Sequence, residues 1–406
     1  MTLTFRPPAP AEMPEFYRVG EYAFSDAWDP EELEAESGLL ARERLVTAEE
    51  DGRLVCQGGA FEFQMAVPGG SARCSGITWI GVLPTHRRRG ILTGMMSYLH
   101  QMAHEAGEPV AALWAAESAI YPRFGYGMAA ADVDLEIERD KARWAATRET
   151  TGRVRLIDAK DAAAAYGPVY EHELARRPGM MPRDERWWAV RLLDTKERRD
   201  GASNLFHAVH EGPAGIDGYV AYRVKYQQGK ADPGSVVKVL ELVANTEDAY
   251  RAVWNFCFNI DLSVKIQARH RPADEPLAWM LADFRQLQVR QTDGLWVRLV
   301  DVDAALSARR YAVEGSLVIE VVDDGCPWNA GRHHLEGAMY GAHCSATNAE
   351  PDLRLDVRDL GATYLGGVDF TLLAAAGRVE ECTPGALSRA DAMFRWRPAP
   401  WCPAVF

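Results

Sequence analysis

The fold is decided by the stretch Trp79-Ile80-Gly81-Val82-Leu83-Pro84-Thr85-His86-Arg87-Arg88-Arg89-Gly90-Ile91-Leu92-Thr93. A strand is expected to end near Val82, and a loop with three arginines leads into a helix. The first turn of a helix presents unpaired backbone N–H groups at the positive end of the helix dipole, and these groups bind phosphate. Gly90 has no side chain, so a pyrophosphate can approach the backbone closely, and the arginines add charge-assisted donors. The stretch therefore predicts a pyrophosphate site.

A solvated basic loop is the alternative interpretation of the three arginines. The helix expected over 87–106 argues against it, because its apolar residues share one face and Gly107 is a plausible stop. The residues of that face are Ile91, Leu92, Met95, Met96, Leu99, Met102 and Ala103. The loop lacks the Gly-Lys-Ser/Thr ending of a Walker loop.

The residues around this helix alternate between strand and helix patterns. In the first segment we expect strands at 2–6, 44–47, 54–65, 72–82 and 109–114, a helix at 10–24, and a helix and turn over 119–127. In the second we expect strands at 206–210, 219–225, 236–243 and 264–268 and a helix at 246–258. In the third we expect strands at 296–300, 316–322 and 353–357. With 406 residues, the chain exceeds a single core and predicts two or three domains.

The run from Pro84 to Gly90 resembles the acetyl-CoA signature Arg/Gln-x-x-Gly-x-Gly/Ala of the GNAT N-acetyltransferases. Arg87 and Gly90 match this signature, whereas Leu92 stands where its last Gly or Ala is expected. In this departure the chain resembles the Eis (enhanced intracellular survival) family. Two further stretches resemble the same family: AALWAAESAIYPRFGYG at 111–127 and LGATYLGG at 360–367.

The resemblance covers the whole chain and implies an α/β (α+β) fold with three domains. A GNAT acetyl-CoA-binding catalytic domain is expected at 1–147, a degenerate GNAT-like domain at 148–295, and a sterol-carrier-like α+β domain at 296–406. In the second domain, acidic residues and no glycine follow the strand that ends near Val243: Ala244-Asn245-Thr246-Glu247-Asp248. Negative side chains suit a helix N-terminus but repel pyrophosphate, so only the first domain is expected to bind coenzyme A.

Tyr121 is the expected general acid, because a phenol with a pKa of ~10 is protonated at neutral pH and can donate to a leaving thiolate. The resemblance assigns this role to the tyrosine of the run Ile120-Tyr121-Pro122-Arg123-Phe124-Gly125. Tyr126 is the competitor and is expected to be structural. An ordinary packing role is the alternative for either tyrosine.

The resemblance points to the α-carboxylate of Phe406 as the base. The preceding residues, Trp401-Cys402-Pro403-Ala404-Val405, are apolar and favour a docked tail. An exposed α-carboxyl has a pKa of ~3.3–3.7, too low for an efficient base, and docking in an apolar cleft would raise it. A frayed terminus is the alternative.

Other site residues are implied by the same resemblance. Backbone groups around Ile80 and Val82 are expected to hold the pantetheine arm, and Arg87, Arg88, Gly90 and Ile91 the phosphates. Asp26, with Phe24, Trp114 and Glu117, is expected to contact the substrate. A helix-terminal Asp is the alternative for Asp26.

The net charge of −13 argues against nucleic acid as a partner and favours cationic molecules. No signal peptide and no apolar run of the ~18 residues that a membrane span needs is visible, which predicts a cytoplasmic protein without a membrane partner.

Seven cysteines without a CxxC pair predict reduced, buried thiols. His100 and His104 lack a third ligand, and His333-His334 is expected in a turn-rich stretch, so no metal site is expected.

The expected function is acetyl-CoA-dependent N-acetylation of amines of polycationic small molecules such as aminoglycosides, by direct transfer in a ternary complex. There are two alternatives. One is acetylation of protein lysines, and the other is lipid binding by a module that uses the GNAT fold as a scaffold. The resemblance also implies a homo-oligomer, specifically a homohexamer.

Overall fold

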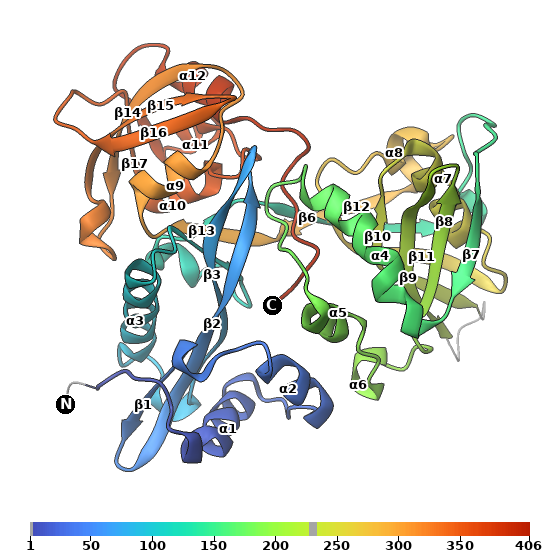
Figure 1. Cartoon of the computed structure of the whole chain (residues 1–406), viewed down its shortest axis with the longest axis horizontal. Helices are drawn as coiled ribbons and strands as arrows, with labels where there is room; N and C mark the ends of the chain where they lie inside the picture. Colours follow the sequence, from blue (N-terminus) through green and yellow to red (C-terminus); the bar gives the residue numbers. More distant parts are fainter. Residues whose placement is uncertain (1–2, 227–233) are drawn as a thin grey trace.

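A computed structural model describes residues 3–226 and 234–406 and contains three β-sheets (Figure 1). The first sheet has the order β1-β2-β3-β4-β13-β5. Its strands are β1 (Leu45–Glu50), β2 (Arg53–Val67), β3 (Gly70–Val82), β4 (Val110–Trp114), β5 (Gly127–Met128) and β13 (Leu295–Leu299). Its helices are η1 (Pro10–Glu12), α1 (Met13–Phe24), α2 (Pro30–Ser37), η2 (Arg42–Arg44), η3 (Pro84–His86), α3 (Ile91–Glu105) and η4 (Tyr121–Phe124).

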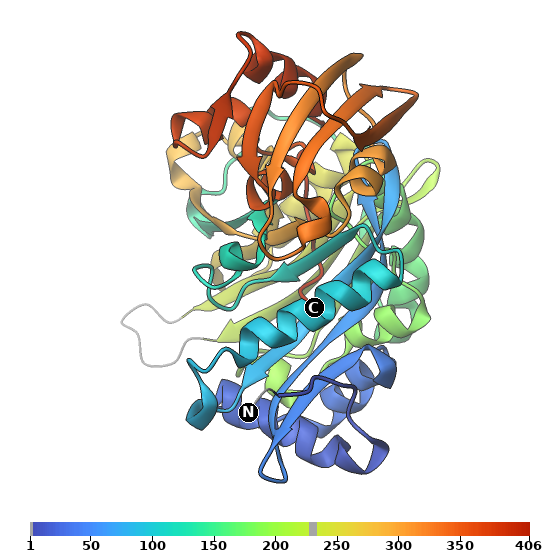
Figure 2. The same cartoon turned by 90° about the vertical axis from the view of Figure 1, so that its left-hand side faces the viewer.

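Apolar alternation along the strands gives this sheet two buried faces. Phe16 and Val19 of α1 pack on one face with Cys74, Val110 and Ala112. Helix α3 covers the other, where its apolar stripe meets Ile77, Ala111 and Leu113. Figure 2 shows α3 lying along the strands of this sheet. The prediction of one apolar helix face is therefore confirmed, although the helix begins at Ile91 rather than at Arg87.

The second sheet has the order β12-β6-β11-β10-β9-β8-β7. Its strands are β6 (Ala131–Glu138), β7 (Arg153–Ile157), β8 (Phe206–Gly212), β9 (Gly215–Tyr226), β10 (Ser235–Ala244), β11 (Ser263–Pro272) and β12 (Gln288–Asp293). Its helices are η5 (Arg139–Lys141), α4 (Ala159–Leu174), α5 (Glu185–Leu192), α6 (Lys196–Arg199), α7 (Glu247–Phe258), α8 (Leu277–Met280) and η6 (Phe284–Gln286).

The third sheet has the order β16-β15-β14-β17-β18. Its strands are β14 (Gly315–Val322), β15 (Gly331–Ala338), β16 (Gly341–Ala346), β17 (Leu353–Asp356) and β18 (Val379–Glu381). Its helices are α9 (Val302–Ala308), η7 (Pro327–Asn329), α10 (Val357–Thr363), α11 (Phe370–Ala375) and α12 (Ala386–Phe394).

Two strands cross the predicted domain limits. β6, for which no strand was predicted, lies within the limits of the predicted first domain but pairs with β11 and β12 of the second sheet. β13, expected to open the third domain, pairs with β4 and β5 of the first sheet. The order of the elements along the chain does not reveal that these strands pair across the predicted limits, because strand pairing is set by burial in three dimensions.

Two smaller sequence predictions, a strand at 2–6 and a turn-rich stretch at His333-His334, are wrong. Residues 3–5 form no strand, and Arg6 makes only an isolated bridge with Thr47; residue 2 lies outside the described residues. His333 and His334 lie in strand β15 rather than in turns.

The motif at 360–367 is a packing contact between the third domain and the first sheet. Gly361 of α10 lies against β13, where an added Cβ would come within 2.3 Å of the Val297 carbonyl oxygen. Gly127 of β5 faces α10, where a Cβ would lie 1.9 Å from the Arg358 carbonyl oxygen. Only glycine allows the two backbones to approach this closely.

A buried ion pair joins the same two units. Arg298 of β13 donates two hydrogen bonds to the Asp323 carboxylate, at 2.8 and 2.7 Å, and a third to the Phe124 carbonyl oxygen of η4 at 2.6 Å. Removing one partner of such a buried pair leaves an uncompensated charge, so this contact fixes η4 relative to the third domain.

Among the described residues, no helix is long and apolar enough to cross a membrane. All seven cysteines are unpaired, and six of them are buried.

Candidate active site

The first sheet opens between β3 and β4. These parallel strands pair only over Cys74–Gly76 and Val110–Ala112, although β3 continues for six residues beyond Gly76, to Val82. Beyond this point, none of the strands in the described part of the chain pairs with the edge of β3 that faces β4. Its backbone groups can therefore pair with an extended ligand that carries amides, as an added strand would. The predicted pantetheine contacts Ile80 and Val82 lie on this open part, and both side chains are half-buried.

A β-bulge bends β3 within the open part. The register with β2 shifts between Gln57 and Gly59, and Trp79 adopts a left-handed conformation with φ of 56°. A non-glycine residue in this region is strained, and such residues gather at functional sites. A bulge bends its strand locally, and this one lies in the part of β3 that does not pair with β4.

The arginine loop joins β3 to α3. Arg89 pairs with Glu50 through two hydrogen bonds of 2.8 and 2.7 Å, and Arg87 donates to the Ala23 carbonyl oxygen at 2.9 Å. Arg88 is exposed and has no side-chain partner within the part of the chain that the structure describes. Of the three guanidinium groups, that of Arg88 is therefore the least committed to protein contacts.

Gly90 is the N-cap of α3, with φ of 80°, and no side chain caps the helix. An added Cβ at Gly90 would meet no atom within 4 Å, so the space in front of the first turn is open. Ile91 begins the helix and is buried. The predicted phosphate site thus has free backbone N–H groups and an uncommitted arginine beside it.

The end of α1 lies beside the end of β3. The Ala23 methyl group is 2.8 Å from the position of a Cβ on Gly81, and the Phe24 ring is 3.7 Å from it. Phe24 is 49% exposed, and Asp26 is exposed two residues further on. The structure thus brings both predicted substrate residues next to the arginine loop.

The C-terminal tail is docked at the point where the two strands separate. The Phe406 ring packs on Phe63 with centroids 4.9 Å apart and on Phe61 at 6.3 Å. One of its atoms lies 3.2 Å from where a Cβ of Gly76, the last paired residue of β3, would stand. The predicted docking of the tail therefore agrees with the structure.

Tyr121 and Tyr126 differ in their surroundings. Tyr126 is fully buried, and its hydroxyl lies 3.1 Å from His100 Nε2. Tyr121 is 7% exposed, and its hydroxyl has no hydrogen-bond partner among the described residues. Burial, and secondarily the nearby Glu117 carboxylate, raise the pKa of Tyr121. Its phenol therefore stays protonated at neutral pH and is free to donate.

The two predicted catalytic residues approach the opening from opposite faces of the sheet. Tyr121 belongs to the apolar cluster under α3, with Ile77 and Leu113. Phe406 packs against the cluster on the other face, with Phe61 and Cys74. A ligand held between β3 and β4 would therefore lie between Tyr121 and Phe406.

Trp114 and Glu117 follow at the end of β4. The Trp114 indole N–H donates to the Ala404 carbonyl oxygen at 2.8 Å, so this side chain holds the tail, and its substrate contact stays a prediction. Its ring also meets His270 edge-on at 5.4 Å, and His270 Nδ1 lies 2.5 Å from the buried Asp132 carboxylate. Glu117 is exposed.

Sequence reasoning missed an aromatic wall at this site. Trp79 meets Trp28 at 5.5 Å and Tyr17 at 6.1 Å, in both cases edge-on. The Trp28 indole N–H donates to the Tyr17 carbonyl oxygen at 3.0 Å. Aromatic faces of this kind attract cations. No spacing in the sequence joins these three residues, because they come from α1, from the loop before α2 and from β3.

A pocket of about 320 Å³ between the first and second units was also missed. Its lining includes Glu36, Arg198, Glu241 and the tail residues Ala404 and Val405. Burial raises the pKa of Glu36, and Arg198 opposes this shift from 3.1 Å. The pocket thus reaches the tail from the side of the second unit.

The second unit repeats the strand-to-helix turn without an open anion site. Thr246 caps α7 by accepting the Ala249 N–H at 3.1 Å. Glu247 pairs with Arg148, and Asp248 accepts a hydrogen bond of 2.6 Å from the Thr151 hydroxyl. Side chains already occupy the positive end of this helix, which supports the prediction of a single coenzyme site.

Three features together define a GNAT-type N-acetyltransferase. They are two parallel strands that separate, an arginine loop at the start of a helix, and a buried tyrosine beside the opening. Family models for GNAT acetyltransferase domains match residues 4–129 and 179–299, and a sterol carrier protein domain matches residues 302–403.

The similar proteins extend over the whole chain. An uncharacterized N-acetyltransferase of Streptomyces avermitilis is 41% identical over 93% of this chain and 92% of its own length. The N-acetyltransferase Eis of Mycobacterium bovis is 33% identical over 97% of both chains. The crystal structure of Eis1 from Mycobacterium abscessus has a TM-score of 0.86 at 33% identity and covers 99% of this chain and 100% of its own. The chain belongs to the Eis family of GNAT N-acetyltransferases.

Proposed function

We propose that this protein transfers the acetyl group of acetyl-CoA to amines of polycationic small molecules, such as aminoglycosides, by direct attack in a ternary complex. The observation that carries the proposal is the seating of Phe406 at Gly76, where β3 and β4 separate. This position supports a carboxylate close to a thioester held in the opening.

Each end of acetyl-CoA has a matching group in this site. Arg87, Arg88, Gly90 and the first turn of α3 at Ile91 face the pyrophosphate, and the open edge of β3 at Ile80 and Val82 pairs with the pantetheine amides. The acetyl group then lies near Gly76. GNAT acetyltransferases in general use acetyl-CoA, and the open space at Gly90 supports the same use here.

Transfer proceeds by one attack. The amine nitrogen attacks the thioester carbonyl carbon, and the amine proton passes to the Phe406 carboxylate. The C–S bond then breaks, and the Tyr121 hydroxyl donates to the leaving thiolate. Because the pKa of Tyr121 is raised, this phenol stabilises the thiolate mainly as a hydrogen-bond donor. The products are an N-acetyl amide and free coenzyme A.

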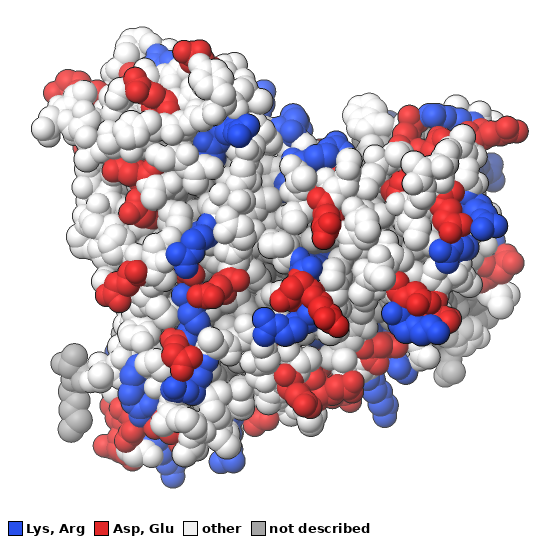
Figure 3. Space-filling model, in the orientation of Figure 1, with Lys and Arg blue, Asp and Glu red and all other residues white. Residues whose placement is uncertain are grey.

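Negative charge around the site supports a cationic acceptor. Asp26 and Glu117 are exposed near the mouth. The sequence of α2, PEELEAES, contains four glutamates and no basic residue. Figure 3 shows acidic side chains gathered over the region of α2. With the aromatic wall of Tyr17, Trp28 and Trp79, these groups favour a molecule with several amino groups.

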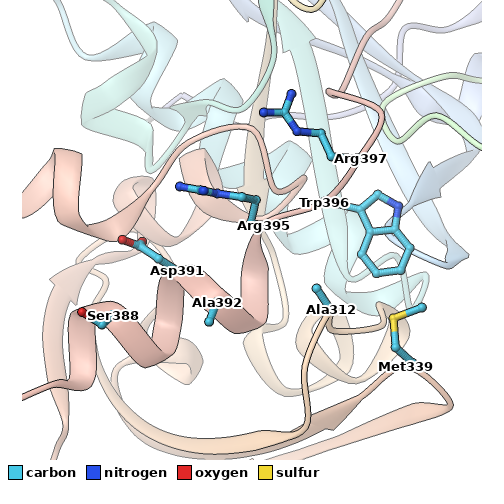
Figure 4. Close-up of a pocket in the computed structure, with 8 residues that line it drawn as sticks. All are labelled: Ala312, Met339, Ser388, Asp391, Ala392, Arg395, Trp396 and Arg397. Carbon is cyan, nitrogen blue, oxygen red and sulfur yellow. The ribbon is translucent and has the colours of Figure 1, made fainter.

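A lipid-binding module is less well supported. The pocket in the third domain, about 650 Å³, is lined partly by charged side chains. Figure 4 shows Asp391, Arg395 and Arg397 among its lining residues. The interior between the sheet and helices of this domain is filled by buried side chains, among them Tyr311, Phe370, Met393 and Phe394. A lipid site encloses most of the surface of its ligand, whereas this pocket is widely open to solvent.

A substrate panel tests the proposal. Coenzyme A release is measured with acetyl-CoA and aminoglycosides, linear polyamines, lysine peptides and lipid amines. Release with aminoglycosides or polyamines, with intersecting double-reciprocal plots, is expected. Release with lysine peptides alone would replace the small-molecule proposal by protein acetylation. Thermal stabilisation by a fatty acid but not by acetyl-CoA would favour the lipid-binding module.

Assembly into a homohexamer is also a proposal, and it rests on the family resemblance. A cytoplasmic location is a further proposal, which does not depend on that resemblance. Light scattering on the purified protein measures the assembly, and a mass six times that of one chain is expected.

A further inference from the structure

Three potential metal ligands meet in the third domain, away from the acetyl-transfer site. Asp303 comes from the first turn of α9, His333 from β15 and Cys344 from β16. One ligand atom of each lies within 4.8 Å of the other two. His333 and Cys344 are each 5% exposed, and Asp303 is half-buried. No step of the proposed acetyl transfer uses these side chains.

The ligand types suit zinc, and their spacing needs only a small adjustment. In a tetrahedral site with bonds of ~2.0–2.3 Å, ligand atoms are about 3.3–3.8 Å apart. His333 Nδ1 and Asp303 Oδ1 are 2.7 Å apart, so a small movement admits an ion between them. Imidazole nitrogen, thiolate sulfur and carboxylate oxygen are the three ligand types that proteins use for Zn²⁺.

The second imidazole nitrogen is already fixed. His333 Nε2 donates to the Asn329 carbonyl oxygen at 2.9 Å. Metal-bound histidines typically donate their other N–H to a carbonyl or carboxylate, which fixes the ring orientation. This contact leaves Nδ1 as the nitrogen available to a metal.

Charge balance is compatible with a bound ion. A Zn²⁺ ion held by the Cys344 thiolate, the Asp303 carboxylate and a neutral His333 imidazole forms a group with no net charge, so its burial would bury no net charge.

Asn329 is itself held rigidly. Its side chain accepts the Val302 N–H at 3.0 Å and donates to Asp323 Oδ2 at 3.1 Å. Asp323 pairs with Arg298, which holds the Phe124 carbonyl of η4. The cluster is thus one end of a buried hydrogen-bonded chain that crosses from the third domain to the first.

We propose that Asp303, His333 and Cys344 bind one divalent zinc ion, which fastens α9 to the β15–β16 hairpin. The site departs from the expectation of no metal, which considered the histidines only with their neighbours in sequence. The ion has a structural role in this proposal, because none of the three ligands lies at the opening between β3 and β4.

Cobalt titration tests the site directly. The full chain is purified without an affinity tag, stripped with a chelator, and titrated with Co²⁺. One equivalent is expected to bind and to give a near-ultraviolet thiolate-to-cobalt charge-transfer band, with visible bands of cobalt coordinated by the three side chains and one water molecule. Added Zn²⁺ is expected to remove both sets of bands and to raise the melting temperature of the stripped protein.

Variants assign the ligands. Cys344→Ser is expected to lose the charge-transfer band, and Asp303→Asn to keep it with an affinity about tenfold or more lower. Cys382→Ser, which alters the exposed cysteine, is the matched control and is expected to behave as the parent chain. If Cys344→Ser does not fold, His333→Gln takes its place, and loss of stoichiometric binding is expected.

Two results would overturn the proposal. One is the absence of saturable binding of Co²⁺ or Zn²⁺ to the stripped parent chain. The other is a charge-transfer band that survives in Cys344→Ser or disappears in Cys382→Ser, since the band would then arise from another thiol. Because every readout is metal binding rather than turnover, the test is independent of the proposed acetyl transfer.

Discussion

The Trp114 indole N–H donates a hydrogen bond of 2.8 Å to the carbonyl oxygen of Ala404, although 290 positions separate the two residues in the chain. Trp114 is the last residue of β4, and Ala404 lies two residues before Phe406. The bond ties the tail to the strand that forms one side of the opening. With the packing of Phe406 on Phe63, it determines where the α-carboxylate can lie.

Extending the chain beyond Phe406 tests the role of this carboxylate. Two added residues, Gly-Ser, move the charge away from the opening, and kcat is expected to fall about 10²-fold or more, the usual contribution of a general base. Acetyl-CoA affinity, measured by calorimetry, is expected to stay unchanged. Phe406→Leu keeps both the length and the carboxylate and is the matched control. Full activity of the extended chain would remove the carboxylate from the mechanism.

Tyr121→Phe separates binding from chemistry. This variant keeps the ring but not the proton, so kcat is expected to fall about 10²-fold or more while acetyl-CoA still binds. Tyr126→Phe is the matched control. It removes the contact to the buried His100 and is expected to lower the free energy of unfolding by about 1–3 kcal/mol with kcat largely kept. A large fall of kcat in Tyr126→Phe with kcat kept in Tyr121→Phe, measured in stopped assays, would exchange the roles of the two tyrosines.

Arg88→Ala tests the phosphate site. Because the Arg88 side chain has no partner among the described residues, its loss is expected to act on the ligand alone. The KM for acetyl-CoA is expected to rise about tenfold, which corresponds to one lost charge-assisted hydrogen bond of ~1.4 kcal/mol. Arg89→Ala removes a guanidinium that is already paired with Glu50 and is expected to change KM little. Equal effects in both variants would indicate a general electrostatic role of the loop.

Glu241 links stability to acid pH. It is 5% exposed and accepts hydrogen bonds from Arg183, Arg191 and the Tyr219 hydroxyl. Burial disfavours its charged form, but Arg183 and Arg191 outweigh burial and lower its pKa from 4.5 to about 2. A lowered folded-state pKa means that the stabilisation is complete above pH 4.5 and is lost as the pH falls toward 2. This contribution is on the order of 3 kcal/mol.

Denaturant unfolding of Glu241→Gln measures this contribution. The variant leaves the buried Arg183 side chain without its charge partner and is expected to lose about 3–5 kcal/mol at neutral pH, with less further loss below pH 4.5 than the parent chain. Glu211→Gln removes a surface pairing with Arg153 and Arg155 and is expected to cost less than about 1 kcal/mol. Parallel pH profiles for the parent chain and Glu241→Gln would contradict the assignment.

The local elements were predictable, since their signals are short in sequence. The arginine loop, Gly90 and the apolar stripe of α3 lie within about one strand and one helix of each other, and the structure has them as expected. The left-handed Trp79 and the bulge beside it were not predictable, because the strain is imposed by the register of β2 against β3. The aromatic wall has the same origin in tertiary packing.

The sequence by itself determined the family, the strand-to-helix turn that suits a pyrophosphate, and the apolar character of the tail. Each is set by residue types and spacings over a few positions. Only the tertiary structure decided that β13 completes the first sheet, that Phe406 lies at Gly76, and that Asp303, His333 and Cys344 share one cluster. These contacts join residues that are distant in the chain, and the burial of apolar faces and charged pairs selects them, which no local pattern records.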